Sequence, residues 1–321
     1  MKFLKNNVIK KLFSVLIIGT VGYYFYNSLN RNWSVVSQLE FNFNWLSILA
    51  IISFVLAVVV SGYLWGNTLN ILTVKQNLKI KKSEAIRIHI ASWLLKYIPG
   101  QAGSVINKVL WGKNKGYSKK LILITFVYEN IFLIVASFLL SVPLLLISSG
   151  YDEFTNNPIY ILVIILSLLS AAIILNEKSM YAITNFIFSK ILKQPVGKEL
   201  FLETTQSIKL LLSYMIPRIL NALGFIFVTA SFLRVDYVTY IPLGAAYIIG
   251  GAIGIMALFV PSGIGVREAV IVLFSTPFIG SAPAIVVAII ARLYSTLADG
   301  VLAAGYILLN LINKKAERQN K

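Results

Sequence analysis

The stretch "FVPSGIGVREAV", Phe259–Val270, interrupts a long apolar tract with a proline, two glycines and an adjacent Arg267–Glu268 pair. A helix that spans a bilayer needs about 20 predominantly apolar residues, so a breaker followed by two charges is not required for spanning. Proline removes a backbone donor and glycine permits a sharp turn. Such a break is tolerated at membrane depth only where the backbone is buried in protein or lines a watered cavity. The stretch therefore predicts a broken helix beside a functional site.

The tract around this stretch is one of several in a chain that is 58% hydrophobic and only 13% charged, with a mean hydropathy of +0.80. Soluble domains have roughly a quarter of their residues charged. We therefore predict an all-α polytopic membrane protein with about six to eight transmembrane helices in a single integral-membrane domain, residues 1–321. The apolar runs are 12–30, 46–69, 121–149, 158–175, 208–233, 240–260, 263–279 and 282–312.

The composition excludes several classes of function. The chain has no cysteine and a single histidine, so cysteine metal sites and thiol catalysis are excluded. The formal charge of +17 comes from basic residues between the apolar runs, where topology explains them without nucleic acid. No phosphate-binding Gly-Lys loop, metal-ligand cluster or close carboxylate–histidine pair stands out. We expect no enzyme activity, catalytic residue, metal or cofactor.

Loop charges predict the topology of the first half. Segments 75–87 and 108–120 are both rich in lysine, which places both in the cytoplasm. The run between them, broken by "YIPGQAGS", is then either a re-entrant hairpin or an amphipathic helix on the membrane surface. Segment 176–207 is basic and is expected to be an amphipathic cytoplasmic segment.

The second half offers two topologies. The loop at 234–239 is expected outside and the basic C-terminal tail inside, so 240–312 crosses an odd number of times. Runs 240–260 and 263–279 are either two full spans or a second re-entrant hairpin. We favour the hairpin because "YIPGQAGSVINKVL" and "FVPSGIGVREAVIV" share an aromatic–apolar–Pro start and a glycine four residues after the proline. Opposed broken elements of this kind are typical of an inverted repeat and mark a binding site.

Charged residues at membrane depth are candidate binding residues by default. Arg267 and the N–H groups of 263–266 suit an anion such as phosphate, because helix N-termini attract anions; the alternative is a structural kink with Arg267 paired to a carboxylate. Arg292 and Asp299 are seven residues apart and could brace each other or neighbouring helices. For four of these residues a structural ion pair and a substrate contact stay open: Glu129, Arg218, Arg292 and Asp299.

Three further polar residues flank the first break. Lys96 and Lys108 are expected to extend to the cytoplasmic headgroups. His89 is expected at the surface, at the cytoplasmic start of a helix.

The motif "PSGIGVREA", taken with "YIPGQAGSVINKVLWG", resembles the transmembrane, flippase-type domain of the lysylphosphatidylglycerol synthase family, over almost the whole chain. The resemblance implies translocation of a lipid or lipid-linked substrate. It marks the motif positions as substrate-binding candidates that line a cavity: Pro99, Gly100, Gly103, Pro261, Gly263, Gly265, Arg267 and Glu268.

The chain ends at "LINKKAERQNK", so a stand-alone member without the C-terminal aminoacyltransferase domain is expected. The substrate is then an anionic phospholipid or a polyprenyl- or glycosyl-linked lipid. We expect a multi-pass protein of the cytoplasmic membrane, with both termini in the cytoplasm and membrane lipids as partners. One alternative is a non-transporting partner subunit of a glycosyltransferase or lipid-synthesis enzyme. Another is an intramembrane lipid-modifying enzyme.

Overall fold

A computed structural model describes residues 43–74, 78–96, 102–192, 200–257 and 260–319, with the single residues Tyr23, Tyr26, Asn30 and Gly197. Within this part of the chain all regular elements are helical, so the predicted all-α class is confirmed. The α-helices are α3 (Trp45–Leu72), α4 (Lys82–Trp93), α5 (Ala102–Asn114), α6 (Lys119–Asn156), α7 (Pro158–Leu175), α8 (Glu177–Leu192), α9 (Thr204–Phe232), α10 (Tyr237–Met256), α11 (Val266–Ile279) and α12 (Ser281–Gln319).

Five of these helices, α3, α6, α9, α10 and α12, are long and apolar enough to span a bilayer. A sixth candidate joins α7 to the start of α8 across a bend of 98°. The predicted run 12–30 lies largely outside the described residues. Large apolar side chains remain exposed on these helices, for example Leu162, Leu168 and Leu169 of α7. Such faces would promote aggregation in water and instead suit contact with lipid, and the chain is a multi-pass membrane protein.

Caps and turns in the sequence set several helix boundaries. The Asn44 side chain accepts hydrogen bonds from the N–H groups of Leu46 and Ser47 at the start of α3. The same side chain donates to the Ser231 carbonyl at 3.2 Å, which ties the start of α3 to the end of α9. Pro158 opens α7 behind the Asn157 cap, a position where the missing N–H costs nothing.

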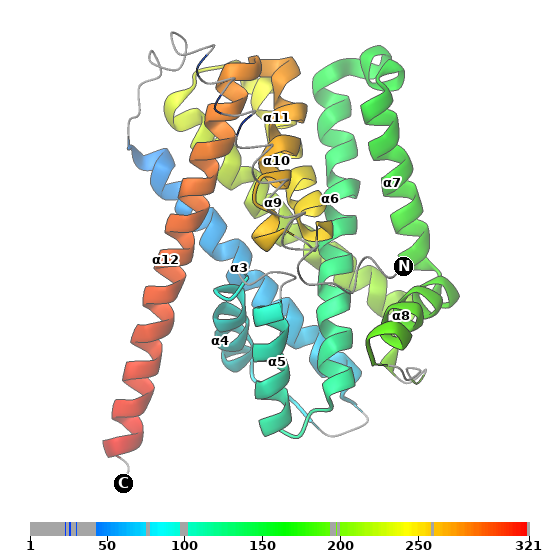
Figure 1. Ribbon diagram of the computed structural model, residues 1–321, viewed down its shortest axis with the longest axis vertical. Helices are drawn as coiled ribbons and strands as arrows, with labels where there is room; N and C mark the ends of the chain where they lie inside the picture. Colours follow the sequence, from blue (N-terminus) through cyan, green and yellow to red (C-terminus); the bar gives the residue numbers. More distant parts are fainter. Residues whose placement is uncertain are drawn as a thin grey trace.

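The helix pairs α4–α5 and α10–α11 are each connected to their neighbouring long helices at one end of the bundle, the first pair at the lower end and the second at the upper end (Figure 1). In Figure 1, α3 ends and α6 begins at the lower end, and α4 and α5 between them occupy the lower half. At the upper end α9 ends and α12 begins, and α11 lies in the upper half. The described part of the run 88–107 thus belongs to two packed helices, α4 and α5, rather than to one surface helix. α10 and α11 also pack on each other, and a re-entrant path for this second pair stays a prediction, since α10 alone is long enough to span a bilayer.

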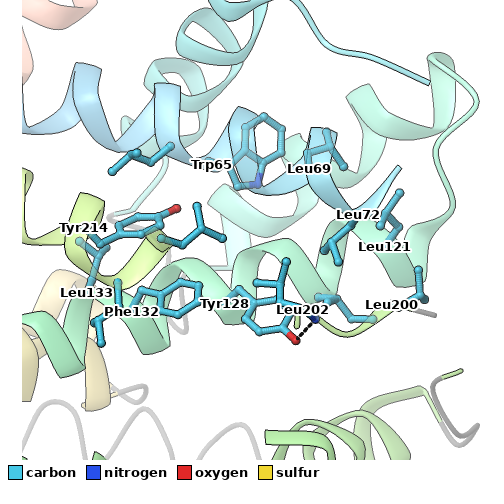
Figure 2. Close-up of a cluster of buried hydrophobic side chains, with 14 of the residues drawn as sticks. Trp65, Leu69, Leu72, Leu121, Tyr128, Phe132, Leu133, Leu200, Leu202 and Tyr214 are labelled. Carbon is cyan, nitrogen blue, oxygen red and sulfur yellow. Dashed lines mark hydrogen bonds between the residues drawn. The ribbon is translucent and has the colours of Figure 1, made fainter. Parts of the chain in front are cut away.

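The core is built mainly of aromatic and leucine side chains between α3, α6 and α9. Tyr128 stacks on Phe132, which stacks on Tyr214, with ring centroids 5.7 and 5.5 Å apart (Figure 2). The Tyr128 hydroxyl accepts a hydrogen bond from the Leu202 N–H at 3.1 Å. A second cluster joins α3 and α9 to α10, α11 and α12. These clusters hold α3, α6, α9 and α12 around the two hairpins.

Segment 176–207 contains α8, which turns away from α7 at the lower end of the bundle (Figure 1). A helix does form in this segment, and its attachment to a membrane surface stays a prediction.

Candidate functional site

A cavity of about 150 Å³ lies between the two hairpins, with Lys96 and Ser104 of the first and Ser262 and Gly263 of the second in its lining. Its walls come from α3, α4, α5, α6, α9, α10, α11, α12 and the turn 260–263. One part of the wall is apolar, with Phe54, Val58, Leu133 and Ile255. The other part is polar or charged: Ser61, His89, Lys96, Ser104, Glu129, Asn130, Arg218, Asn221, Tyr247, Ser262, Arg267, Ser295 and Asp299.

The second break is a single 3₁₀ turn, Pro261–Gly263, followed by a glycine cap. Ser262, Gly263 and Gly265 have φ of 52°, 64° and 86°, the left-handed region that glycine tolerates best. A Cβ atom on Gly263 would lie 2.8 Å from the Gly254 Cα of α10. Glycine at 263 therefore lets the turn pack directly on the α10 backbone.

The prediction that the N–H groups at the start of α11 are open to an anion is partly wrong, because the Glu268 side chain binds there. Its carboxylate Oε2 accepts a hydrogen bond from the Gly265 N–H at 2.6 Å. A carboxylate of the chain itself thus occupies the helix N-terminus, where negative charge is favourable. The side chains of α11, rather than its first N–H groups, are the better candidates for ligand contact.

An ion pair joins the inner end of α4 to α12. The Lys96 ammonium lies 2.7 Å from Asp299 Oδ2, and the Trp93 indole N–H donates to Asp299 Oδ1 at 2.8 Å. The Lys96 ammonium also lies 4.1 Å from the centre of the Trp93 ring. The expectation that Lys96 extends to headgroups is wrong, because its side chain is mostly buried and bound across the cavity.

A second ion pair joins α12 to the second break. Arg292 Nη1 lies 3.6 Å from Glu268 Oε1 and donates to the Ser262 carbonyl at 3.5 Å. Arg292 and Asp299 thus each form an ion pair with a different hairpin. α12 is therefore the helix to which both broken elements are attached.

A third ion pair is fully buried beside the cavity. The Lys108 ammonium lies 2.6 Å from Glu129 Oε2 and 4.6 Å from the centre of the Trp65 ring. His89 Nδ1 lies 3.4 Å from Glu129 Oε1, and neither His89 ring nitrogen has a hydrogen-bond partner among the described residues. The expected surface positions of Lys108 and His89 are both wrong, since both side chains are buried. The structure also brings together the carboxylate–histidine pair that the sequence did not reveal.

Two arginines face the cavity without a carboxylate within 4.0 Å in the described part of the chain. Arg218 of α9 is 6% exposed; its Nε donates to the Leu133 carbonyl at 3.0 Å, and its buried Nη2 has no partner among the described residues. Arg267 of α11 places its guanidinium 4.2 Å from the centre of the Tyr247 ring. The electron-rich face of the ring attracts the guanidinium but does not neutralise its charge.

The structure brings many of the predicted site residues together. Gly263, Arg267, Glu129, Arg218 and Asp299 line the cavity. Glu268 and Arg292 bind each other next to the cavity wall, where Arg292 also donates to the carbonyl of the lining residue Ser262. Gly265 caps α11. Gly103 is buried in α5 beside the lining residue Ser104. Pro99 and Gly100 lie outside the described residues, and of Pro261 the structure describes only the backbone.

Sequence reasoning missed Trp93, Asn130, Asn221 and Tyr247 in the cavity wall. The two asparagines carried a usable signal, since each is a polar residue in a predicted span. The glycine-rich stretch "YIIGGAIGI" that begins at Tyr247 was a weaker signal: a Cβ on Gly251 would lie 3.2 Å from Arg218 Nη1.

Comparison with protein families gives a match over residues 8–303, which includes all the cavity-lining residues. The chain belongs to the lysylphosphatidylglycerol synthase transmembrane-region family. No curated protein matches the chain. Membership of this family gives the protein a function related to membrane lipids, and the transmembrane region of the lysylphosphatidylglycerol synthase family is typically not catalytic on its own.

Proposed function

We propose that the protein translocates an anionic phospholipid or a polyprenyl- or glycosyl-linked lipid across the cytoplasmic membrane. The observation that carries the proposal is the pair Arg218 and Arg267, two cations from different helices that face one cavity between opposed broken hairpins. Intramembrane cations are costly and usually face a substrate pathway or a partner. A headgroup phosphate is a partner that suits guanidinium geometry.

The cavity is suited to the headgroup and the first part of the lipid chains. Guanidinium and amide groups are available to phosphate and hydroxyl oxygens, and the apolar wall is available to the glycerol and first methylenes. The α4–α5 pair lies in the lower half of the bundle and α11 in the upper half (Figure 1), and residues of both pairs line the cavity, as expected for a transporter built from inverted repeats. Separation of α12 from one hairpin at a time would expose the cavity alternately to each side.

The two ion pairs on α12 provide the contacts that such separation would break. Lys96–Asp299 holds the α4–α5 hairpin and Arg292–Glu268 holds the α10–α11 hairpin. We place the α4–α5 end and both termini in the cytoplasm, because basic loops favour that side.

Arg267→Gln tests the proposal in liposomes that contain the purified protein and a lipid with a fluorescent acyl chain. Transport is measured as the fraction of lipid bleached by a membrane-impermeant reductant. A charge-assisted hydrogen bond contributes roughly 1.5–3 kcal/mol, so we expect Arg267→Gln to lower the rate about tenfold or more. Arg234→Gln, at an exposed arginine in the loop before α10, is the matched control and should move lipid like the parent.

Other outcomes would assign other functions. If the folded parent moves no lipid above empty vesicles, the alternative of a partner subunit for a glycosyltransferase or lipid-synthesis enzyme is favoured. If the lipid is chemically altered in these vesicles, the His89–Glu129 pair beside the cavity is favoured as the centre of an intramembrane enzyme. If Arg267→Gln moves lipid like the parent, the headgroup is bound elsewhere.

A further inference from the structure

The charges around the cavity do not balance within the described part of the chain. Each of the three carboxylates lies within 4.0 Å of one cation, in the pairs Lys96–Asp299, Lys108–Glu129 and Arg292–Glu268. Arg218 and Arg267 remain, and the described residues supply no carboxylate to either. The site therefore carries two positive charges in excess.

These two arginines lie over neighbouring glycines of α10. Arg218 Nη1 would be 3.2 Å from a Cβ on Gly251, and the Arg267 Cβ would be 3.3 Å from a Cβ on Gly254. Gly251 and Gly254 are three residues apart on one helix, so they share a face. The missing side chains let both arginines approach the same strip of α10 at the cavity wall.

Two adjacent cations without counter-charges, Arg218 buried and Arg267 half-buried, are unfavourable, because burial removes water that would stabilise them. A phosphodiester carries one negative charge and would leave one guanidinium uncompensated. A phosphate monoester carries nearly two charges and three strong acceptor oxygens, and a diphosphate diester carries two charges. Building on the proposed function, we propose that the substrate is a lipid with a dianionic phosphate headgroup, a monoester or a diphosphate, rather than a phosphodiester or cationic aminoacyl lipid.

The surroundings favour lipid-borne phosphate over free phosphate. Phe54, Val58 and Ile255 line the same cavity, and the helices that contribute them, α3 and α10, are apolar enough to lie in a bilayer. Free phosphate would gain nothing from this apolar wall, whereas the chains next to a lipid headgroup would be stabilised by it.

The experiment compares two probes that differ by one methyl group and one charge: dioleoyl phosphatidic acid and dioleoyl phosphatidylmethanol. Both are offered at equal concentration to the purified protein at about pH 8.5, where the monoester is doubly charged, and the bound lipids are counted by native mass spectrometry. We expect the parent to prefer phosphatidic acid about tenfold or more. Arg218→Gln and Arg267→Gln should each bring the ratio close to one, and Arg234→Gln should leave it unchanged. Because the ratio is taken within one preparation, partial unfolding of a variant does not alter it.

A ratio near one in the parent, or a preference that survives in both cavity variants, would overturn the dianion inference. Release of phosphatidic acid by excess inorganic phosphate would assign the site to the free anion and overturn it as well. The liposome assay separates this inference from the proposed function. Transport of both lipids at equal rates would retain translocation and reject the dianion, whereas a strong binding preference without transport would retain the dianion and reject translocation.

Discussion

At the scale of single residues, the contacts of Arg218 and Arg267 depend on guanidinium geometry. Arg218 donates from Nε to the Leu133 carbonyl and keeps a second nitrogen, Nη2, for another partner, in a fixed planar fork that the lysine ammonium lacks. The Arg267 guanidinium lies over the Tyr247 ring, 4.2 Å from the ring centre. Lysine at either position should retain part of the affinity for anionic lipid, because it keeps the charge and loses the fork.

The sequence predicted that Arg267 lies at membrane depth beside a helix break, because the neighbouring proline and glycines lie in an apolar tract. It could not predict that Arg218 of another helix faces the same cavity, because that depends on how α9 and α11 are rotated about their axes. The errors at His89 and Lys108 have the same origin. Basic loops next to α4 and α5 favoured a surface position, and the inward rotation of both helices buried these side chains instead.

Gly263→Ala tests the backbone contact at the second break. The new Cβ would lie 2.8 Å from Gly254 Cα and 3.1 Å from Gly254 O, and neither backbone atom can move without moving α10. The positive φ of 64° adds roughly 1–2 kcal/mol of strain for a residue with a Cβ. We expect a Tm lower by several degrees, measured by thermal unfolding in detergent, together with loss of lipid transport.

Gly300→Ala is the matched control, because Gly300 is helical and its Cβ would meet nothing within 4 Å. Its Tm should be equal to or above that of the parent, since alanine favours a helix over glycine. A Gly263→Ala protein as stable and active as the parent would mean that the turn and α10 are not packed this closely in the membrane.

At the scale of elements, α12 carries one partner for each hairpin. Asp299 and Arg292 are seven residues apart, roughly 10 Å along the helix axis at 1.5 Å per residue. The pairs with Lys96 and Glu268 therefore lie at two levels of the same helix. The sequence showed that the two residues share a face, but not which residues they bind, because their partners are brought close only by tertiary packing.

Asp299→Asn and Arg292→Gln should release different hairpins from α12. Loss of one partner of a largely buried pair can cost about 3–5 kcal/mol, enough to shift an equilibrium between two arrangements. Both variants are made together with Ser104→Cys, which places a single cysteine in the cavity because the chain has no native cysteine. The measurement is the rate at which an impermeant maleimide, added to one side of the vesicles or the other, alkylates this cysteine. We expect Asp299→Asn to raise the rate from the α4–α5 side and Arg292→Gln to raise it from the opposite side. Equal rises from one side in both variants would contradict separate attachment.

At the scale of the whole molecule, the chain repeats one order of elements. A long helix, a broken hairpin and a second long helix follow one another as α3, α4–α5, α6 and again as α9, α10–α11, α12. In each unit the helix after the break is tied to the next long helix by an ion pair. The signs are exchanged: Lys108 binds Glu129 in the first unit, and Glu268 binds Arg292 in the second. This order agrees with the inverted repeat that the two Pro–Gly motifs predicted.

The repeat has a consequence for topology that single cysteines can test in intact cells. Four exposed residues can each be replaced by cysteine. Two of them, Lys79 and Asn114, flank the first hairpin, and the other two, Arg234 and Ser281, flank the second. If each hairpin returns to its own side, the first two positions react alike and the last two react alike. Because basic loops stay inside, an impermeant maleimide should label Arg234→Cys and Ser281→Cys in intact cells, and the other two only after permeabilisation. Labels on opposite sides at 79 and 114 would make α4–α5 a true crossing. Opposite labels at 234 and 281 would make α10–α11 cross once, and either result would remove the opposed hairpins on which the shared cavity depends.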